Sequence, residues 1–212
     1  MKNHVKYTSV NSFETLNRLD DRTKNIWFIF HGIGFLSRYF LNFFKDLPKE
    51  ENFIIAPQAP SKYYLDSTYK KVGASWLTRE DTSMEINNVL AYLDAVYESI
   101  NIPEEPNVFV LGYSQGVSIA ARWVAGRKIN CNKLIFYAGG LPNELGSEDF
   151  DFLSKDTEII MIHGDEDPYL SPDRLRQEKQ KLQVLFKDRA RMIVFEGGHE
   201  LIPAQIQRLI GL

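Results

Sequence analysis

The chain has 212 residues, and its 25 basic and 28 acidic side chains give a formal net charge of −3. A hydrophobic fraction of 44% and a charged fraction of 25% are those of an ordinary globular protein and argue against extensive disorder. The weak negative charge gives no electrostatic reason to expect a nucleic acid or an anionic membrane as partner. The length favours one domain, so we expect residues 1–212 to form a single domain.

The predicted strands begin at the N-terminus. Residues 1–25 are expected to supply a lead-in and an edge hairpin, with arms at Val5–Val10 and Phe13–Leu16. Six further runs are continuously apolar, which is typical of strands covered on both faces of a sheet. They are Ile26–Phe30, Phe53–Ala56, Val108–Leu111, Leu134–Tyr137, Ile159–Ile162 and Met192–Phe195.

Helical patterns lie between these strands. Apolar residues recur at three- and four-residue steps across Ile86–Tyr97, and Thr82 with Glu85 forms a capping box in front of them. Ser171 and Pro172 supply the N-cap and the first residue of a later helix. This alternation predicts an α/β fold, a mostly parallel sheet with helices on both faces.

Two stretches after predicted strands, Pro57–Asp81 and Gly139–Thr157, carry no regular pattern. Loops beyond the carboxyl ends of parallel strands line the ligand crevice of an open sheet, so we expect both stretches to wall a site. Neither is long enough for a separate cap domain.

A G-x-S-x-G pattern, Gly112–Gly116, follows the strand at Val108–Leu111 and precedes the helical stretch Val117–Ala125. Between a strand and a helix, this pattern predicts a sharp turn that exposes Ser114 as a nucleophile. The alternative is a glycine-rich turn whose serine only caps the helix.

A nucleophilic serine needs a base and an orienting carboxylate. His199 follows the last predicted strand, and Asp165, Glu166 and Asp167 follow the strand before it. Serine, acid and histidine then occur in the order expected of α/β-hydrolases.

The segment His31–Gly34 closes the strand Ile26–Phe30 and leads into a helix-like segment, Phe35–Leu47. In such a fold this loop offers a backbone N–H to an oxyanion, together with the residue after the nucleophile. We therefore predict an oxyanion hole made by the N–H groups of Ile33 and Gln115.

Four spaced motifs stand out: HGIG at His31–Gly34, GYSQG at Gly112–Gly116, HGDEDP at His163–Pro168 and GGH at Gly197–His199. Together they resemble the phospholipase/carboxylesterase family of α/β-hydrolases, which includes bacterial carboxylesterases and acyl-protein thioesterases. The resemblance implies an α/β-hydrolase fold and hydrolysis of a carboxylic ester or thioester through an acyl-serine intermediate. Its H-G-x-x-D pattern places the acid of the triad at Asp167, beside Ser114 and His199.

The chain departs from the family pattern around the expected pocket. Phe35 replaces the Asp of H-G-L-G-D, Val117 replaces the final Gly of G-F-S-Q-G-G, and Trp76-Leu77-Thr78 replaces W-F-D. A lipidated-protein substrate is therefore not implied. Arg79 is a candidate for recognising a substrate carboxylate, although a solvated loop charge is its more common role. The residues proposed to line the pocket are Phe35, Tyr63, Tyr64, Trp76, Tyr113 and Leu141.

Other classes of function fit less well. The segment Gly32–Ser37 lacks the third glycine of a dinucleotide fingerprint, and the sequence has no P-loop. A metal site is not expected, because His163 with Asp165 and Asp167 lacks a second nearby histidine. The main alternative is a non-catalytic ligand-binding or interaction protein on the same fold. Such relatives usually lose a member of the triad, so the complete set favours an enzyme.

The predicted substrate is a small-molecule or lipid-like ester, hydrolysed without a cofactor or metal. A single cysteine, Cys131, excludes an internal disulfide and fits a reducing compartment. No signal-peptide pattern is visible, and the apolar runs are shorter than the roughly 20 residues that span a bilayer. We expect a cytoplasmic protein without stable membrane insertion; the sequence does not decide whether it forms a homodimer.

Overall fold

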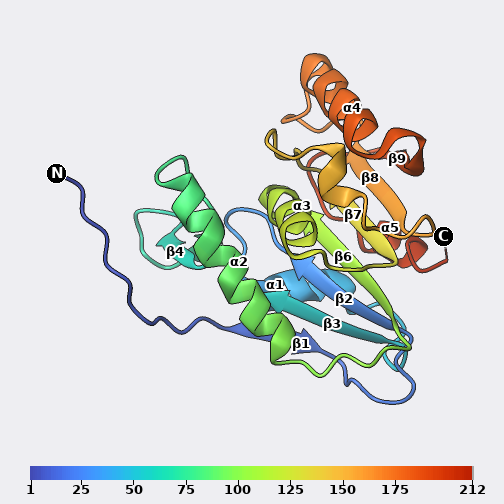
Figure 1. Cartoon of the computed structure of the whole chain (residues 1–212), viewed down its shortest axis with the longest axis horizontal. Coiled ribbons are helices and arrows are strands. Elements are labelled where there is room, and N and C mark those ends of the chain that lie inside the picture. The colour runs from blue at the N-terminus through green and yellow to red at the C-terminus, as the bar shows by residue number, and fades with distance from the viewer. Residues whose placement is uncertain (212) are drawn as a thin grey trace.

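The computed structural model describes residues 1–211 and contains a seven-stranded sheet in the order β1-β3-β2-β6-β7-β8-β9 (Figure 1). In this sheet β3, β2, β6, β7, β8 and β9 run parallel, and β1 pairs antiparallel with β3 at one edge. The strands are β1 (Phe13–Leu16), β2 (Asn25–Phe30), β3 (Asn52–Pro57), β6 (Asn107–Tyr113), β7 (Lys133–Tyr137), β8 (Glu158–Gly164) and β9 (Ala190–Phe195). The predicted α/β-hydrolase architecture is confirmed.

Helices cover both faces of the sheet, as predicted. They are α1 (Ser37–Phe40), α2 (Thr82–Glu98), α3 (Gln115–Arg127), α4 (Pro172–Phe186) and α5 (Pro203–Arg208), with short 3₁₀ turns at Leu41–Phe44, Ser147–Phe150 and Lys187–Arg189. Helices α2, α3 and α4 pack on one core cluster, and α1 and α5 on the other. Within the described chain, no helix has the length and apolar character needed to cross a membrane.

The two cores explain why the strands are continuously apolar. In β2, Ile26, Phe28 and Phe30 belong to the core under α2 and α3, while Trp27 and Ile29 belong to the opposite core. Successive side chains of a strand point to opposite faces, so a sheet covered on both faces needs an apolar residue at every position.

The predicted N-terminal hairpin is wrong in its first arm. Residues Val5–Val10 form no strand, and β1 takes β3 as its partner instead. The chain before β1 is fixed at its end, where the Asn11 amide donates to the Gln58 carbonyl over 2.7 Å. Pairing with a buried strand gives β1 a hydrogen-bonded edge that an isolated hairpin lacks.

The capping box predicted for α2 is also wrong. The N-cap is Asp81 in a left-handed conformation (φ 48°), and Thr82 is already helical. The Thr82 hydroxyl instead donates to the carbonyl of Thr78 over 2.9 Å. The cap of α4 is as predicted, because the Ser171 hydroxyl accepts the N–H of Arg174.

The stretch Pro57–Asp81, expected to be irregular, contains a separate two-stranded antiparallel sheet of β4 (Ser61–Tyr64) and β5 (Val72–Ser75). It packs against the loop that follows β2. The Gly34 N–H donates to the Ala74 carbonyl over 2.8 Å, and a Cβ at Gly73 would lie 2.5 Å from the Gly34 carbonyl oxygen. Such an approach admits only glycine at position 73.

Candidate active site

The turn between β6 and α3 holds Ser114 in a strained backbone conformation, with φ 52° and ψ −117°. Glycines allow the two elements to approach this closely. A Cβ at Gly112 would lie 2.4 Å from the Gly116 carbonyl oxygen, and one at Gly116 would lie 2.0 Å from that of Phe30. The glycines of the motif are thus required by backbone contacts, and they present the Ser114 hydroxyl at the carboxyl edge of the sheet.

Three side chains from distant segments form one hydrogen-bonded chain at this edge. The Ser114 Oγ lies 2.9 Å from His199 Nε2, and His199 Nδ1 lies 2.7 Å from Asp167 Oδ2. The Asp167 side chain is fully buried and that of His199 is 18% exposed. A buried carboxylate on Nδ1 selects the tautomer whose Nε2 accepts the serine proton.

The neighbouring carboxylates have other contacts. Asp165, at the end of the β8 region, accepts the N–H of Gly197 over 2.9 Å and braces the loop that carries His199. Asp167 also accepts the Tyr169 N–H over 2.9 Å through its second oxygen. Of the three carboxylates that follow β8, Asp167, the residue predicted as the acid, is the one that contacts the imidazole.

Two tyrosines, Tyr113 and Tyr169, contact His199. The Tyr113 hydroxyl donates to the His199 carbonyl over 2.9 Å, and the Tyr169 ring meets the imidazole edge-on at 4.7 Å between centroids. Burial, followed by the charge of Asp167, raises the pKa of Tyr113 to about 12. Tyr113 therefore stays protonated and remains a donor at neutral pH.

Ile33 and Gln115, whose N–H groups were predicted to form the oxyanion hole, both line the cleft. Gln115 is the first residue of α3, where an N–H has no intrahelical acceptor. Within residues 1–211, no acceptor is found for the N–H of Ile33. The Gln115 side chain accepts the Trp76 N–H over 2.9 Å and donates to the Leu77 carbonyl over 2.7 Å.

His31 is engaged in contacts within the core. It is fully buried, its Nδ1 donates to the Gly32 carbonyl over 2.8 Å, and its Nε2 accepts the Ala59 N–H over 3.1 Å. Burial lowers the pKa of His31 to about 4. The neutral imidazole thus ties the His31–Gly34 loop to the segment after β3.

A cleft of about 530 Å³ surrounds Ser114. Of the predicted pocket residues, Phe35 and Tyr113 line it. Tyr63 and Tyr64 lie exposed on β4 outside the lining, so the structure does not bring them into the cleft.

Trp76 and Leu141 are likewise not part of the cleft wall, contrary to the prediction, because both are buried. The Trp76 indole donates to the His31 carbonyl over 2.8 Å, and the Leu141 N–H donates to the Glu178 carboxylate over 2.9 Å. Both residues support loops beside the cleft from within the core.

The sequence interpretation missed several lining residues. Ser118 on α3, Tyr169 and Leu170 in the loop after β8, and Arg174 on α4 all reach the cleft. Arg79, the candidate that the sequence offered for recognising a substrate carboxylate, is exposed and does not line the cleft. These four residues belong to none of the recognised motifs, and their spacing in the sequence does not indicate that they line a cleft.

The sheet order, the strained Ser114 turn and the Ser114–His199–Asp167 contacts define the class of α/β-hydrolases. A family model described as Serine hydrolase (FSH1) matches residues 43–209, and the chain belongs to this serine hydrolase family. Membership of this family supports hydrolase activity. No curated protein matches the sequence.

Solved structures share the fold across nearly the whole chain. Acyl-protein thioesterase 2 of Zea mays is 16% identical with a TM-score of 0.72, covering 95% of this chain and 97% of its own. A phospholipase/carboxylesterase of Dyadobacter fermentans is 22% identical with a TM-score of 0.67 and 97% of each chain covered. A carboxylesterase of Mesorhizobium loti is 14% identical with a TM-score of 0.67 and 89% of each chain covered. At these identities the likeness establishes the fold.

Proposed function

We propose that the protein hydrolyses carboxylic esters through an acyl-serine intermediate, with Ser114 as nucleophile, His199 as base and Asp167 as orienting acid. One observation carries this proposal, the continuous hydrogen-bonded chain from the Ser114 hydroxyl through the imidazole to the buried Asp167 carboxylate. Thioesters present the same carbonyl to this site and belong to the same proposed reaction.

In the proposed reaction, His199 takes the proton of Ser114 as the hydroxyl oxygen attacks the ester carbonyl. The N–H groups of Ile33 and Gln115 would hold the resulting oxyanion, each contributing about 3–4 kcal/mol to lowering the barrier. His199 then protonates the departing alcohol. In the second half of the reaction, water attacks the acyl-serine by the same steps, which releases the acid and restores the enzyme.

The proposal is tested by substituting Ser114 with alanine. In the Ser114→Ala variant, kcat/KM for nitrophenyl esters is expected to fall by roughly 10⁴-fold or more, because the nucleophile is lost. Labelling of the wild-type protein by a fluorophosphonate probe should disappear in the same variant.

Ser118 supplies the matched control, since its hydroxyl also lies at the cleft but donates to the Gln115 carbonyl over 2.9 Å. The Ser118→Ala variant is expected to keep fluorophosphonate labelling. If wild type neither hydrolyses any ester nor labels, the proposal fails and a non-catalytic binding role on this fold is favoured.

A further inference from the structure

Arg174 is the only lysine, arginine, aspartate or glutamate among the described residues that line the cleft. The rest of the lining is apolar, glycine, or neutral polar groups around Ser114 and His199. A cation in the wall of a reaction cleft whose lining has no acidic side chain favours a ligand that brings a negative charge.

A buried carboxylate holds this arginine in place. Glu178, one helical turn further along α4, is 1% exposed, and its Oε1 lies 2.9 Å from the Arg174 Nη2. The same carboxylate accepts the Leu141 N–H over 2.9 Å and lies 3.4 Å from the Lys181 Nζ. Arg174 and Lys181 thus share the Glu178 carboxylate, so the charge of Glu178 does not offset both cations.

The guanidinium keeps donors for a ligand. A guanidinium has five N–H donors. Within residues 1–211, the Glu178 carboxylate is the only ion-pair or hydrogen-bond partner found for the Arg174 guanidinium. The Arg174 side chain is 45% exposed. An arginine fixed on one edge and open on the other is pre-organised, so it loses little conformational entropy when it binds a planar anion.

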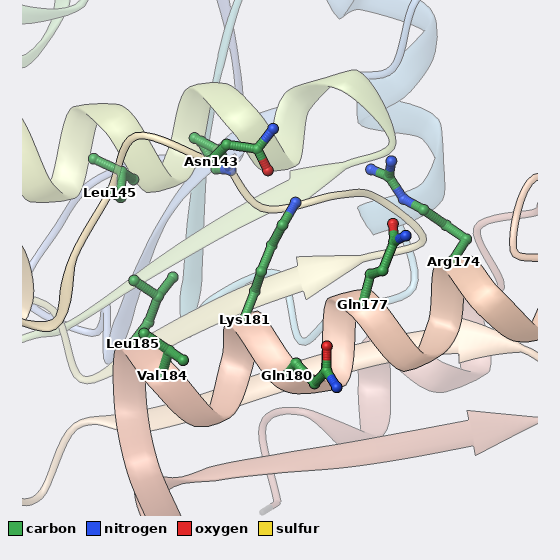
Figure 2. Close-up of a pocket in the computed structure, with 9 residues that line it drawn as sticks. Asn143, Leu145, Arg174, Gln177, Gln180, Lys181, Val184 and Leu185 are labelled. Carbon is green, nitrogen blue, oxygen red and sulfur yellow. The ribbon is translucent and has the colours of Figure 1, made fainter.

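Arg174 also borders a second hollow, beside the cleft, between α4 and the loop after β7 (Figure 2). Figure 2 shows Arg174 and Lys181 extending from α4 toward that loop. Its lining contains no acidic side chain among the described residues. The Lys181 Nζ donates to the Leu141 carbonyl over 3.1 Å, so this second cation supports the loop.

We propose that the cleft selects esters that carry a carboxylate, and that Arg174 binds this carboxylate while Ser114 attacks the ester carbonyl. The inference rests on the proposed esterase function and adds the substrate class. The carboxylate is recognised by the same guanidinium whether it belongs to the acid half or to the alcohol half of the ester.

The test compares two pairs of esters that differ by one charge. The acid half is probed with 4-nitrophenyl hydrogen adipate against 4-nitrophenyl hexanoate, and the alcohol half with 3-carboxyphenyl butyrate against 3-(methoxycarbonyl)phenyl butyrate. The readout is the ratio of kcat/KM within each pair, with the rate in the Ser114→Ala variant subtracted as background. This ratio does not depend on the fraction of active enzyme in a preparation.

In wild type, the charged member of at least one pair is expected to be preferred roughly tenfold to a hundredfold, the range of a charge-assisted hydrogen bond. The preference should disappear in Arg174→Ala, persist in part in Arg174→Lys, and remain in Arg79→Ala, which removes the same charge outside the cleft. Added salt should lower the wild-type preference, a measurement that needs no variant.

If wild type hydrolyses the two esters of each pair with equal kcat/KM, the inference is overturned while the esterase function stands. A preference that survives in Arg174→Ala would overturn it as well. Failure of the esterase function itself looks different, since neither the charged nor the neutral esters would be hydrolysed and fluorophosphonate labelling would be absent.

Discussion

Two walls of the cleft are held in place by different kinds of contact. The first, here called the elbow wall, consists of the Gly112–Gly116 turn and the His31–Gly34 loop, which meet through backbone atoms. The second, the α4 wall, consists of Tyr169, Leu170 and Arg174, whose side chains reach the cleft from the loop after β8 and from α4.

Under the proposed function, the elbow wall sets the reaction geometry and the α4 wall selects the substrate. On the elbow wall a Cβ at Gly116 has no room, so the position of Ser114 follows from main-chain packing. On the α4 wall the Arg174 side chain is placed by one buried carboxylate, Glu178, and is 45% exposed. Changes to side chains on the α4 wall should therefore alter preference among substrates, whereas changes to the elbow wall should alter folding and catalysis together.

The largest effect is expected for Gly116→Ala on the elbow wall. Its Cβ would lie 2.0 Å from the Phe30 carbonyl oxygen, and main-chain atoms cannot move aside cheaply. We expect a loss of more than about 3 kcal/mol in the free energy of unfolding, measured by urea denaturation, and loss of fluorophosphonate labelling.

Gly126, in the same helix, is the control for that substitution. A Cβ there would meet its nearest neighbour, Leu90, at 3.6 Å, which is an ordinary contact. Gly126→Ala should stabilise the protein by up to about 1 kcal/mol, because alanine restricts the unfolded chain. If Gly116→Ala and Gly126→Ala unfold alike, the elbow wall is not held by close main-chain packing.

The next largest effect is expected from protonation of His31, a buried residue of the elbow wall, at acid pH. Its pKa in the folded protein is about 4, against an ordinary value of 6.5, because burial disfavours the charged imidazole. As the pH falls, His31 therefore binds a proton in the unfolded state before it does so in the folded state. The free energy of unfolding keeps the full contribution of His31 above about pH 6.5 and loses it progressively toward pH 4. The total decline from this group is about 3 kcal/mol.

Urea unfolding of wild type and His31→Asn between pH 7 and pH 4.5 measures this contribution. The variant is expected to start less stable, since the Ala59 N–H loses its acceptor, but to lose less stability as the pH falls. Parallel curves for the two proteins would show that His31 does not titrate in this way.

The smallest effect is expected for Tyr169→Ala on the α4 wall. The Tyr169 side chain contacts the edge of His199, but the residue is 73% exposed and its N–H still donates to Asp167. We expect kcat/KM for neutral esters to fall by less than about tenfold and stability to change by less than about 0.5 kcal/mol.

Tyr64→Ala is the matched control, because Tyr64 is 56% exposed on β4 and lies outside the cleft lining. It should leave ester hydrolysis within about twofold of wild type. A loss in Tyr169→Ala comparable to that in Ser114→Ala would show that the α4 wall contributes to reaction geometry, and the contrast between the walls would not hold.

The sequence located the parallel strands well, and the reason is visible in β2 and β7. Both are buried on two faces, so every residue after the polar first position of each strand is apolar, and this continuous run is easily recognised. The edge strand β1 is only partly buried, and it pairs with β3, a strand that is distant in the sequence. Local pattern therefore suggested a hairpin with Val5–Val10 that the tertiary structure replaces.

By itself, the sequence located the buried strands, the turn that carries Ser114, and the loops after strands that carry Asp167 and His199, because these features are local patterns at strand ends. Only the tertiary structure decided which other side chains face the cleft. It buried Trp76 in the core, left Arg79 in solvent and brought Arg174 to the cleft. The surroundings of a side chain depend on which segments pack against it, and no local pattern encodes that packing.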